Sequence, residues 1–151
     1  MQKQADIGAL FQVLNEVGII HQLIQTEMNR RLPDGLHASH FGVLNHLVRL
    51  GDGRTPVSIA SAFQVTKATM TNTLTRLLDR RLIELRPNPG DGRSKLVYLT
   101  EAGRDFRETA IRNLYPAMAG IAENVDLERL LGALPALQEL RVYLDENRSG
   151  S

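Results

Sequence analysis

Cysteine is absent from this sequence of 151 residues. Its absence excludes a disulfide framework, thiolate zinc sites, iron–sulfur clusters and cysteine nucleophiles. The first six residues carry one lysine and no apolar stretch after it, so they do not resemble a secretory signal. Both observations fit the reducing cytoplasm, which is where we expect the protein to act.

Long apolar runs are also lacking. Stretches without charged or strongly polar residues, such as Leu130–Leu137, are far shorter than the roughly 18 residues that a membrane span needs. We therefore expect no membrane partner. Because 42% of the residues are hydrophobic, the chain can form a core in one domain, with or without an oligomerisation element. Only the tail Ser149–Ser151 is predicted to be disordered.

Neither sign of charge dominates, since the formal net charge is +1, but the charges are unevenly distributed. Residues 51–100 contain eight basic and four acidic side chains, whereas residues 101–151 contain six and nine. A basic middle segment indicates a surface for an anion, and nucleic acid is the commonest candidate. A solvated charged face is the alternative.

Helical periodicity dominates the first third of the chain. Apolar residues recur at steps of three and four from Ile7 to Met28, which predicts one long amphipathic helix over about residues 6–32. Pro33-Asp34-Gly35 ends this helix. A second helix is predicted around Phe41–Val48 and stops at Gly51.

Two helices and a hairpin should follow. Thr55-Pro56 opens a short third helix, and Thr66 caps a fourth helix that runs from about Lys67 to Arg80. Ile83–Arg86 and Lys95–Leu99 are strand-like and are separated by a turn rich in proline and glycine. This pattern predicts a β-hairpin.

The last third is predicted to be helical again. Thr100 caps a fifth helix over about residues 101–122, and Asp126 starts a sixth, in which Pro135 should cause a kink or a break. The apolar stripes of the first and last helices exceed what one small core can cover, which indicates a homodimer. A monomer that folds its ends over its own middle is the alternative.

The third and fourth helices have the spacing of a helix-turn-helix. Ala60 is small where the helices would touch, Val65 is apolar in the turn, Thr66 is the cap and Met70 is apolar inside the fourth helix. Gln64 occupies the turn position where glycine is common, so it must either adopt a strained conformation or relax the turn. The spacing favours a DNA-reading element, although a purely structural helix pair could share it.

The outward face of the fourth helix carries no acidic side chain before Asp79. The positions predicted to face inward are Val65, Met70, Leu74, Leu77 and Leu78. On the other face Asn72 can pair bidentately with adenine, threonines can donate to bases or phosphates or touch a thymine methyl, and Lys67 and Arg76 can neutralise phosphates. The predicted DNA-binding residues of this helix are Thr66, Lys67, Thr69, Thr71, Asn72, Thr75 and Arg76.

The hairpin tip carries two cations at the end of a glycine-rich turn, a shape able to enter a minor groove. Asp91 is expected either to accept hydrogen bonds from the turn or to pair with Arg93. A merely flexible hairpin is the alternative. The predicted DNA-binding residues of the hairpin are Asp91, Arg93, Ser94 and Lys95.

Residues 83–103 resemble the wing and exit signature of the MarR family of bacterial transcription regulators, whose core is Asp-x-Arg followed by Leu-Thr-x-x-Gly. The flanking helices also fit, so the resemblance covers essentially residues 1–151. It implies a mainly α fold with a small β-hairpin wing, namely a winged helix-turn-helix over residues 37–100 with long N- and C-terminal dimerisation helices over residues 6–32 and 101–147. It further implies that the fourth helix enters the major groove and that Arg93 reaches the adjacent minor groove.

Three positions depart from the family pattern. Arg81 stands where a glycine usually ends the recognition helix, at a cost of about 1 kcal/mol if its backbone is left-handed. Leu85 stands where an arginine is common, with Arg86 one position later, and His37 replaces the usual capping hydroxyl of the second helix. These changes affect how the wing contacts phosphate and leave the expected fold unchanged.

The resemblance also implies release from DNA by a small aromatic or phenolic effector, bound between the dimer helices and the winged part. No residue of the sequence indicates that pocket, and no cofactor is expected. His37, His40 and His46 lie on one helix without a second histidine cluster, so they are not predicted to bind zinc, and His21 is expected to be a packing residue.

No catalytic motif occurs: Gly-x-Ser-x-Gly, a Walker loop, a dinucleotide fingerprint and His-Glu-x-x-His are all missing, so we expect no enzyme. We predict a sequence-specific double-stranded DNA-binding transcription regulator, a ligand-responsive repressor acting as a homodimer on a pseudo-palindromic operator. The alternative is a winged-helix protein–protein interaction module, which should show exposed apolar anchors on the fourth helix.

Overall fold

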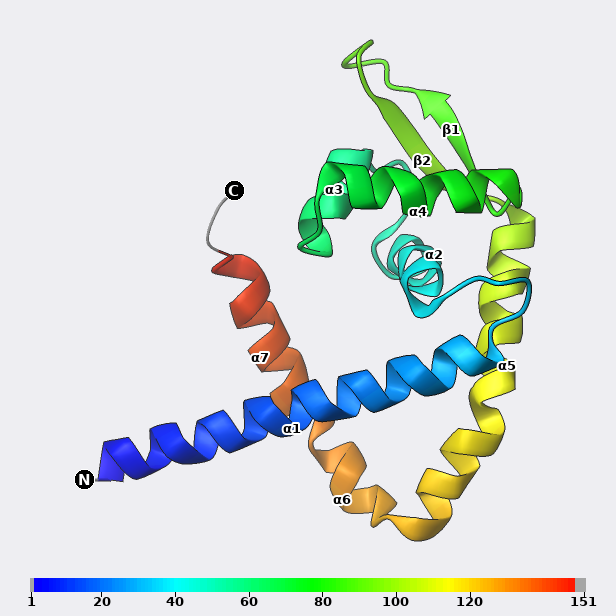
Figure 1. The fold of residues 1–151 in the computed structure, drawn as a ribbon. Helices are drawn as coiled ribbons and strands as arrows, with labels where there is room; N and C mark the ends of the chain where they lie inside the picture. The colour runs from blue at the N-terminus through cyan, green and yellow to red at the C-terminus, as the bar shows by residue number, and fades with distance from the viewer. Residues whose placement is uncertain (1, 149–151) are drawn as a thin grey trace. The chain divides into compact units, whose positions relative to one another are not determined.

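The computed structural model describes residues 2–148, so the tail Ser149–Ser151 lies outside the described residues (Figure 1). The elements, in chain order, are α1 (Gln2–Arg31), α2 (Ala38–Leu50), α3 (Pro56–Ala62), α4 (Lys67–Asp79), β1 (Ile83–Pro87), β2 (Lys95–Leu99), α5 (Glu101–Asn124), α6 (Leu127–Gly132) and α7 (Leu134–Glu146). The chain divides into two compact units, one up to Ala38 and one from Ser39 onward. The predicted helices and hairpin are confirmed.

The first unit consists of α1 and the turn after it. Near the end of α1, Glu27 pairs with Arg30 and Arg31 across one helical turn, and the hydrogen bonds from these arginines lower the pKa of Glu27. Asp34 and Gly35 then adopt left-handed backbone conformations, with φ of 61° and 68°. The helix therefore ends before the Pro-Asp-Gly sequence, as predicted.

Helix α1 leaves most of its apolar side chains exposed in the single chain, Phe11 by 68% and Leu23 by 66%. His21 is exposed as well in the single chain. By length and composition alone, Asp6–Arg31 could cross a membrane, with a mean hydropathy of 1.4 over its most apolar part. The search for uninterrupted apolar stretches in the sequence did not detect this helix, because isolated polar residues divide its apolar residues into short stretches. Length and composition do not distinguish a span from a helix that another chain covers.

The second unit begins with the winged part, in which α3 and α4 form the helix-turn-helix. Thr55 and Thr66 cap the two helices: their hydroxyl oxygens accept hydrogen bonds from the N–H groups of Ser58 and Thr69, at 3.2 and 3.1 Å. At the end of α3 the N–H of Val65 donates to the carbonyl of Ala60 at 3.1 Å, and Gln64 has a φ of 54°. Of the two outcomes expected for Gln64, the strained one is therefore observed.

Arg81 repeats this arrangement at the end of α4. Its φ is 57°, and the N–H of Leu82 donates to the carbonyl of Leu77 at 3.0 Å. Both helices thus end in a Schellman motif that places a residue other than glycine in the left-handed position.

The core of the winged part is apolar and continuous across its helices and hairpin. Its buried side chains are Val43, Leu44, Leu47, Ile59, Ala60, Met70, Leu74, Leu77, Leu82, Ile83, Val97 and Leu99. Met70, Leu74 and Leu77 face inward as predicted, and Leu78 is half-buried. Val65 is 37% exposed, which corrects its predicted burial, because it lies in the turn outside the α3–α4 contact.

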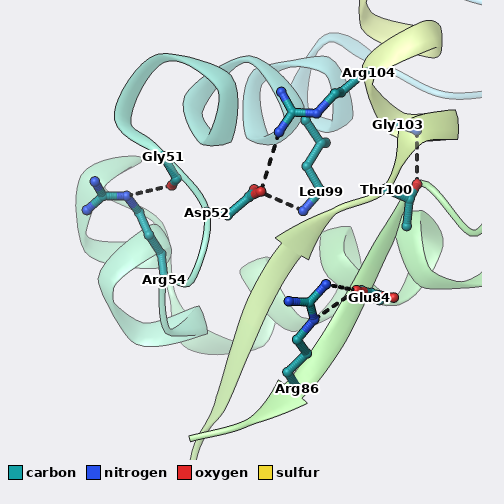
Figure 2. Close-up of polar contacts among 9 residues, drawn as sticks. All are labelled: Gly51, Asp52, Arg54, Glu84, Arg86, Leu99, Thr100, Gly103 and Arg104. Carbon is teal, nitrogen blue, oxygen red and sulfur yellow. Dashed lines mark hydrogen bonds and ion pairs between the residues drawn. The ribbon is translucent and has the colours of Figure 1, made fainter.

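The wing is the antiparallel pair of β1 and β2, in a register that places Ile83 opposite Leu99 and Pro87 opposite Lys95. Arg54 pairs with Val97 of β2 in an isolated antiparallel bridge, in which the N–H of Val97 donates to the carbonyl of Arg54 at 2.8 Å. Before this bridge, Asp52 accepts a hydrogen bond from the N–H of Leu99 at 3.0 Å (Figure 2). Figure 1 shows the hairpin rising from the end of α4, with its tip projecting beyond the helices of the winged part.

Gly103 lies where α5 passes closest to the chain that leaves α4. A Cβ at this position would lie 2.1 Å from the backbone carbonyl oxygen of Leu82 and 2.8 Å from Leu99 Cδ1. Thr100 completes the junction (Figure 2), since its hydroxyl donates to the carbonyl of Arg81 at 2.7 Å and accepts from the N–H of Gly103 at 3.0 Å. The Leu-Thr-x-x-Gly motif is thus a close-packed joint between wing and helix.

The chain continues through α5, which accommodates Pro116 in its interior, to α6 and α7. Asp126 caps α6, and Pro135 lies in the first turn of α7, so the predicted break near this proline is confirmed. None of the side chains of α6 and α7 is buried.

Candidate nucleic-acid interface

Helix α4 presents the predicted residues on its exposed side. Thr66, Lys67, Thr69, Thr71, Asn72, Thr75 and Arg76 are all exposed. Within residues 2–148, the side chains of Asn72, Lys67 and Arg76 make no hydrogen bond or ion pair. These groups are therefore available to a ligand without first breaking a contact in the protein.

The threonine hydroxyls of α4 are already engaged. Thr71 donates to the carbonyl of Lys67 and Thr75 donates to that of Thr71, each at 2.8 Å, and Thr73 donates to that of Thr69 at 3.1 Å. Of the two kinds of contact expected for the threonines, donation to DNA is thus not open to Thr71 and Thr75 in this conformation, whereas contact through the methyl group is. In this arrangement their hydroxyls keep only acceptor capacity, beside their apolar methyl groups.

The hairpin tip is an ordered turn. The carboxylate of Asp91 accepts a hydrogen bond from the backbone N–H of Arg93 at 2.9 Å, and Asn88 donates to the hydroxyl of Ser94 at 2.9 Å. Of the two expected roles of Asp91, the structure shows the turn role and no pairing with the Arg93 guanidinium. The side chains of Arg93 and Lys95 are exposed and have no hydrogen bond or ion pair within residues 2–148.

Arg86 occupies the side of the wing, one position after Leu85. Its guanidinium lies 3.9 Å from the centre of the Tyr98 ring and donates from Nε to Glu84 at 2.9 Å (Figure 2). The hydrogen bond to Glu84 is the main reason why the pKa of Arg86 is raised. The guanidinium of Arg86 is thus engaged within the wing by Glu84 and Tyr98.

The histidines serve the winged part in different ways. His40 and His46 are buried, and the His46 ring lies 5.3 Å from that of Phe63. Burial, with help from nearby Arg49 and Arg54, lowers the pKa of His46. Among residues 2–148, no group of three histidine, aspartate or glutamate side chains is arranged to hold a metal ion.

The sequence analysis missed two features of the second unit. One is the β-bridge made by Arg54, which no local pattern signals because its partner Val97 is 43 residues away. The other is a cavity lined by arginines from α2 and α7, which are far apart in the sequence. Only the arginines themselves are visible in the sequence, and nothing near them indicates that they meet.

Residues 34–94 match the sequence profile of the MarR family. Residues 34–94 therefore resemble the winged helix-turn-helix of the MarR family. The matched segment runs from the turn before α2 to the wing tip and includes all the predicted DNA-binding residues except Lys95. No curated protein matches the chain in sequence.

Solved structures of MarR-family regulators share the fold. A MarR transcriptional regulator from Methanosarcina mazei Go1 superposes with a TM-score of 0.73 at 18% identity, over 87% of this chain and 97% of that chain. The transcriptional regulator BldR from Sulfolobus solfataricus gives 0.71 at 24% identity, over 88% and 96%. A mutant MarR from E. coli, complexed with operator DNA, gives 0.68 at 22% identity, over 87% and 94%.

Proposed function

We propose that this MarR-family chain is a sequence-specific double-stranded DNA-binding transcription regulator. The observation that carries the proposal is the exposed face of α4, where Asn72 is unpaired between two unpaired cations and no acidic side chain intervenes. The phosphates that line a DNA groove attract the cations of this face, whereas solvation alone does not require a helix face without acidic side chains. The operator DNA in the E. coli MarR structure, whose fold this chain shares, supports the same conclusion.

The residues of α4 are expected to make different kinds of contact with DNA. Asn72 can pair bidentately with adenine in the major groove, and Lys67 and Arg76 neutralise phosphates without distinguishing sequence. Because the donors of Thr71 and Thr75 are engaged in the helix, we expect these residues to contact thymine through their methyl groups.

The wing supplies a second contact. Asp91 holds the turn, so Arg93 projects from an ordered tip rather than from a flexible loop. A guanidinium in this place suits the strong negative potential of a narrow minor groove beside the site that α4 reads. Ser94 is half-buried and bonded to Asn88, so we assign it to the turn, whereas Lys95 is exposed and suits phosphate.

The proposal includes a homodimer. Large apolar side chains remain exposed on α1, α6 and α7, a surface of the kind that monomers avoid. The exposed residues of α6 and α7 include Leu130, Leu131, Leu134, Leu137, Tyr143 and Leu144. A second copy of the chain would cover them and present two α4 helices to half-sites about 10 base pairs apart on a pseudo-palindrome.

We further propose repression that ends when a small aromatic or phenolic effector binds, in the cytoplasm where operator DNA lies. This part rests on the family resemblance. The interaction-module alternative predicts apolar anchors on the exposed face of α4, and the large apolar residues of that helix are instead buried or half-buried.

The decisive experiment selects bound duplexes from a random DNA pool at near-physiological salt and measures the mass of the protein in solution. A palindrome recovered by a dimer supports the proposal. Binding that is salt-sensitive but blind to sequence, or a monomer that stays monomeric, contradicts it. Leu131→Asp tests the interface separately, since it should dissociate the dimer and leave the winged part folded.

A further inference from the structure

The link between α2 and α3 runs along the edge of β2 that faces away from β1. The carbonyl of Val97 accepts from the N–H of Gly53 at 2.9 Å, and the N–H of Val97 donates to the carbonyl of Arg54 at 2.8 Å. The N–H of Leu99, two residues on, lies at the same edge and donates to Oδ1 of Asp52 at 3.0 Å (Figure 2). The carboxylate of Asp52 thus acts as the next acceptor along this edge, where a third strand would offer a backbone carbonyl.

The link is itself held in place at both of its ends. Nε of Arg54 donates to the carbonyl of Gly51 at 3.1 Å, which ties the link to the end of α2 (Figure 2). Gly53 has a φ of 77°, and a Cβ at this position would lie 3.0 Å from the hydroxyl oxygen of Tyr98. Glycine permits both this conformation and this close approach to β2. The link therefore provides a fixed base from which Asp52 can hold the strand.

Asp52 also contacts the first turn of α5. Its Oδ2 lies 3.5 Å from Nη2 of Arg104 (Figure 2). The side chain of Asp52 is 25% exposed and that of Arg104 is 54% exposed, so solvent screens this ion pair and its contribution to stability is small. The hydrogen bond to the N–H of Leu99, the last residue of β2, is thus the main contact of the Asp52 carboxylate.

The position of Leu99 controls the position of the wing tip. From Leu99 back to Lys95, β2 spans about 13 Å at the rise of a β-strand, and the tip with Arg93 lies beyond it. A rotation of about 10° at Leu99 would therefore move the far end of the strand by about 2 Å, which exceeds the range of hydrogen-bond lengths. Any freedom at the base of β2 is thus enough to separate the Arg93 guanidinium from a groove that it would otherwise reach.

We propose that Asp52 is a positioning residue for DNA binding by the wing: it accepts the N–H of Leu99, fixes the direction of β2 and so places Arg93 on the DNA. The inference rests on the proposed function. Asp52 is negatively charged, so charge alone would make its removal strengthen DNA binding, whereas a wing that is no longer held binds more weakly. The sign of the effect therefore distinguishes positioning from electrostatics.

The test is a double-mutant cycle on the full-length protein, read by fluorescence anisotropy as affinity for the duplex that the parent selects from the random pool. Asp52→Ala should weaken binding about fivefold in the parent and in Lys67→Ala, but less than about twofold in Arg93→Ala, because a wing without its guanidinium gains nothing from being held. Asp52→Asn keeps an acceptor oxygen for the N–H of Leu99 and should bind within about twofold of the parent. The control is Asp105→Ala, which removes the same charge from an exposed position of α5 and should also stay within about twofold.

Each other outcome overturns the proposal. Equal losses from Asp52→Ala in the Arg93→Ala and Lys67→Ala backgrounds would show a general structural role, and an Asp52→Ala variant that binds like the parent would show no role at all. If Arg93→Ala itself binds like the parent, the wing does not contact DNA, and this inference fails while recognition by α4 stands. If the parent selects no duplex, the proposed function itself is wrong. Circular dichroism confirms beforehand that each variant is folded.

Discussion

Gly103 provides a quantitative test of the joint between the wing and α5. In Gly103→Ala the new Cβ would lie 2.1 Å from the carbonyl oxygen of Leu82, a backbone atom that cannot rotate away. That oxygen also accepts the N–H of Thr100 at 3.2 Å, so a shift of the chain strains a second contact. Adding a group to a packed core typically lowers the free energy of unfolding by about 1–3 kcal/mol. Because the clash here is with a backbone atom, we expect about 3 kcal/mol, the upper end of this range.

Alanine offsets part of this cost, because it favours a helix over glycine by up to about 1 kcal/mol. We therefore expect Gly103→Ala to lower the free energy of unfolding by about 2 kcal/mol, which lowers Tm by roughly 4–8 °C for a chain of this length. The measurement is urea denaturation followed by circular dichroism, at a fixed protein concentration because dimerisation contributes to stability.

Gly120→Ala is the matched control, since it changes the same residue type in the same helix where a Cβ would meet nothing within 4 Å. It should raise the stability by about 0.5–1 kcal/mol through helix propensity. If Gly103→Ala is as stable as Gly120→Ala, the close approach of α5 to Leu82 is not present in the folded protein, and the explanation of the motif is wrong.

Four further predictions concern recognition and stability. Asn72→Ala should change base preference at one operator position by about 1–3 kcal/mol. Lys67→Ala should instead lower the affinity for all DNA sequences alike and reduce the slope of log affinity against log salt concentration by about one. Equal losses of affinity on every sequence for both variants would contradict the assigned roles. Arg93→Ala should lose affinity mainly at flanking A·T positions, and unchanged footprints there would remove the wing contact. Arg81→Gly should stabilise the fold by about 1 kcal/mol, because it relieves a left-handed arginine, and denaturant melts that coincide with those of the parent would refute this. Because the pKa of His46 is lowered in the folded chain, the unfolded chain binds a proton at His46 more readily. The free energy of unfolding should therefore fall as the pH drops below about 6.5. His46→Gln should reduce the difference in stability between denaturant melts at about pH 7 and about pH 5.

Local chemistry explains why so many element boundaries were predictable. Thr55, Thr66, Thr100 and Asp126 each accept a backbone N–H three residues later, so a helix start is encoded within one turn of the chain. The wing turn is equally local, since Asp91 bonds to the backbone two residues on. The exposure of the predicted DNA-binding face of α4 was also predictable, because helical periodicity fixes which residues lie on the side opposite the apolar ones.

Long-range contacts decided what local patterns could not. The exposure of Val65 could only be assigned once the positions of α3 and α4 were known, and runs of residue types do not show what covers the apolar side chains of α1. The hydroxyl of Thr71 can donate either to solvent or to a carbonyl one helical turn away. In the folded helix its rotamer directs it to that carbonyl.

The sequence by itself determined the order and ends of the helices, the hairpin, the capping residues and the cations at the candidate interface, because each depends on neighbours within about five positions. Only the tertiary structure decided the bridge from Arg54 to Val97, the close approach of Gly103 to Leu82, and the presence of Arg49 and Arg141 in the lining of one cavity. These pairs are 21 to 92 positions apart along the chain, so no local preference of the backbone could indicate any of them.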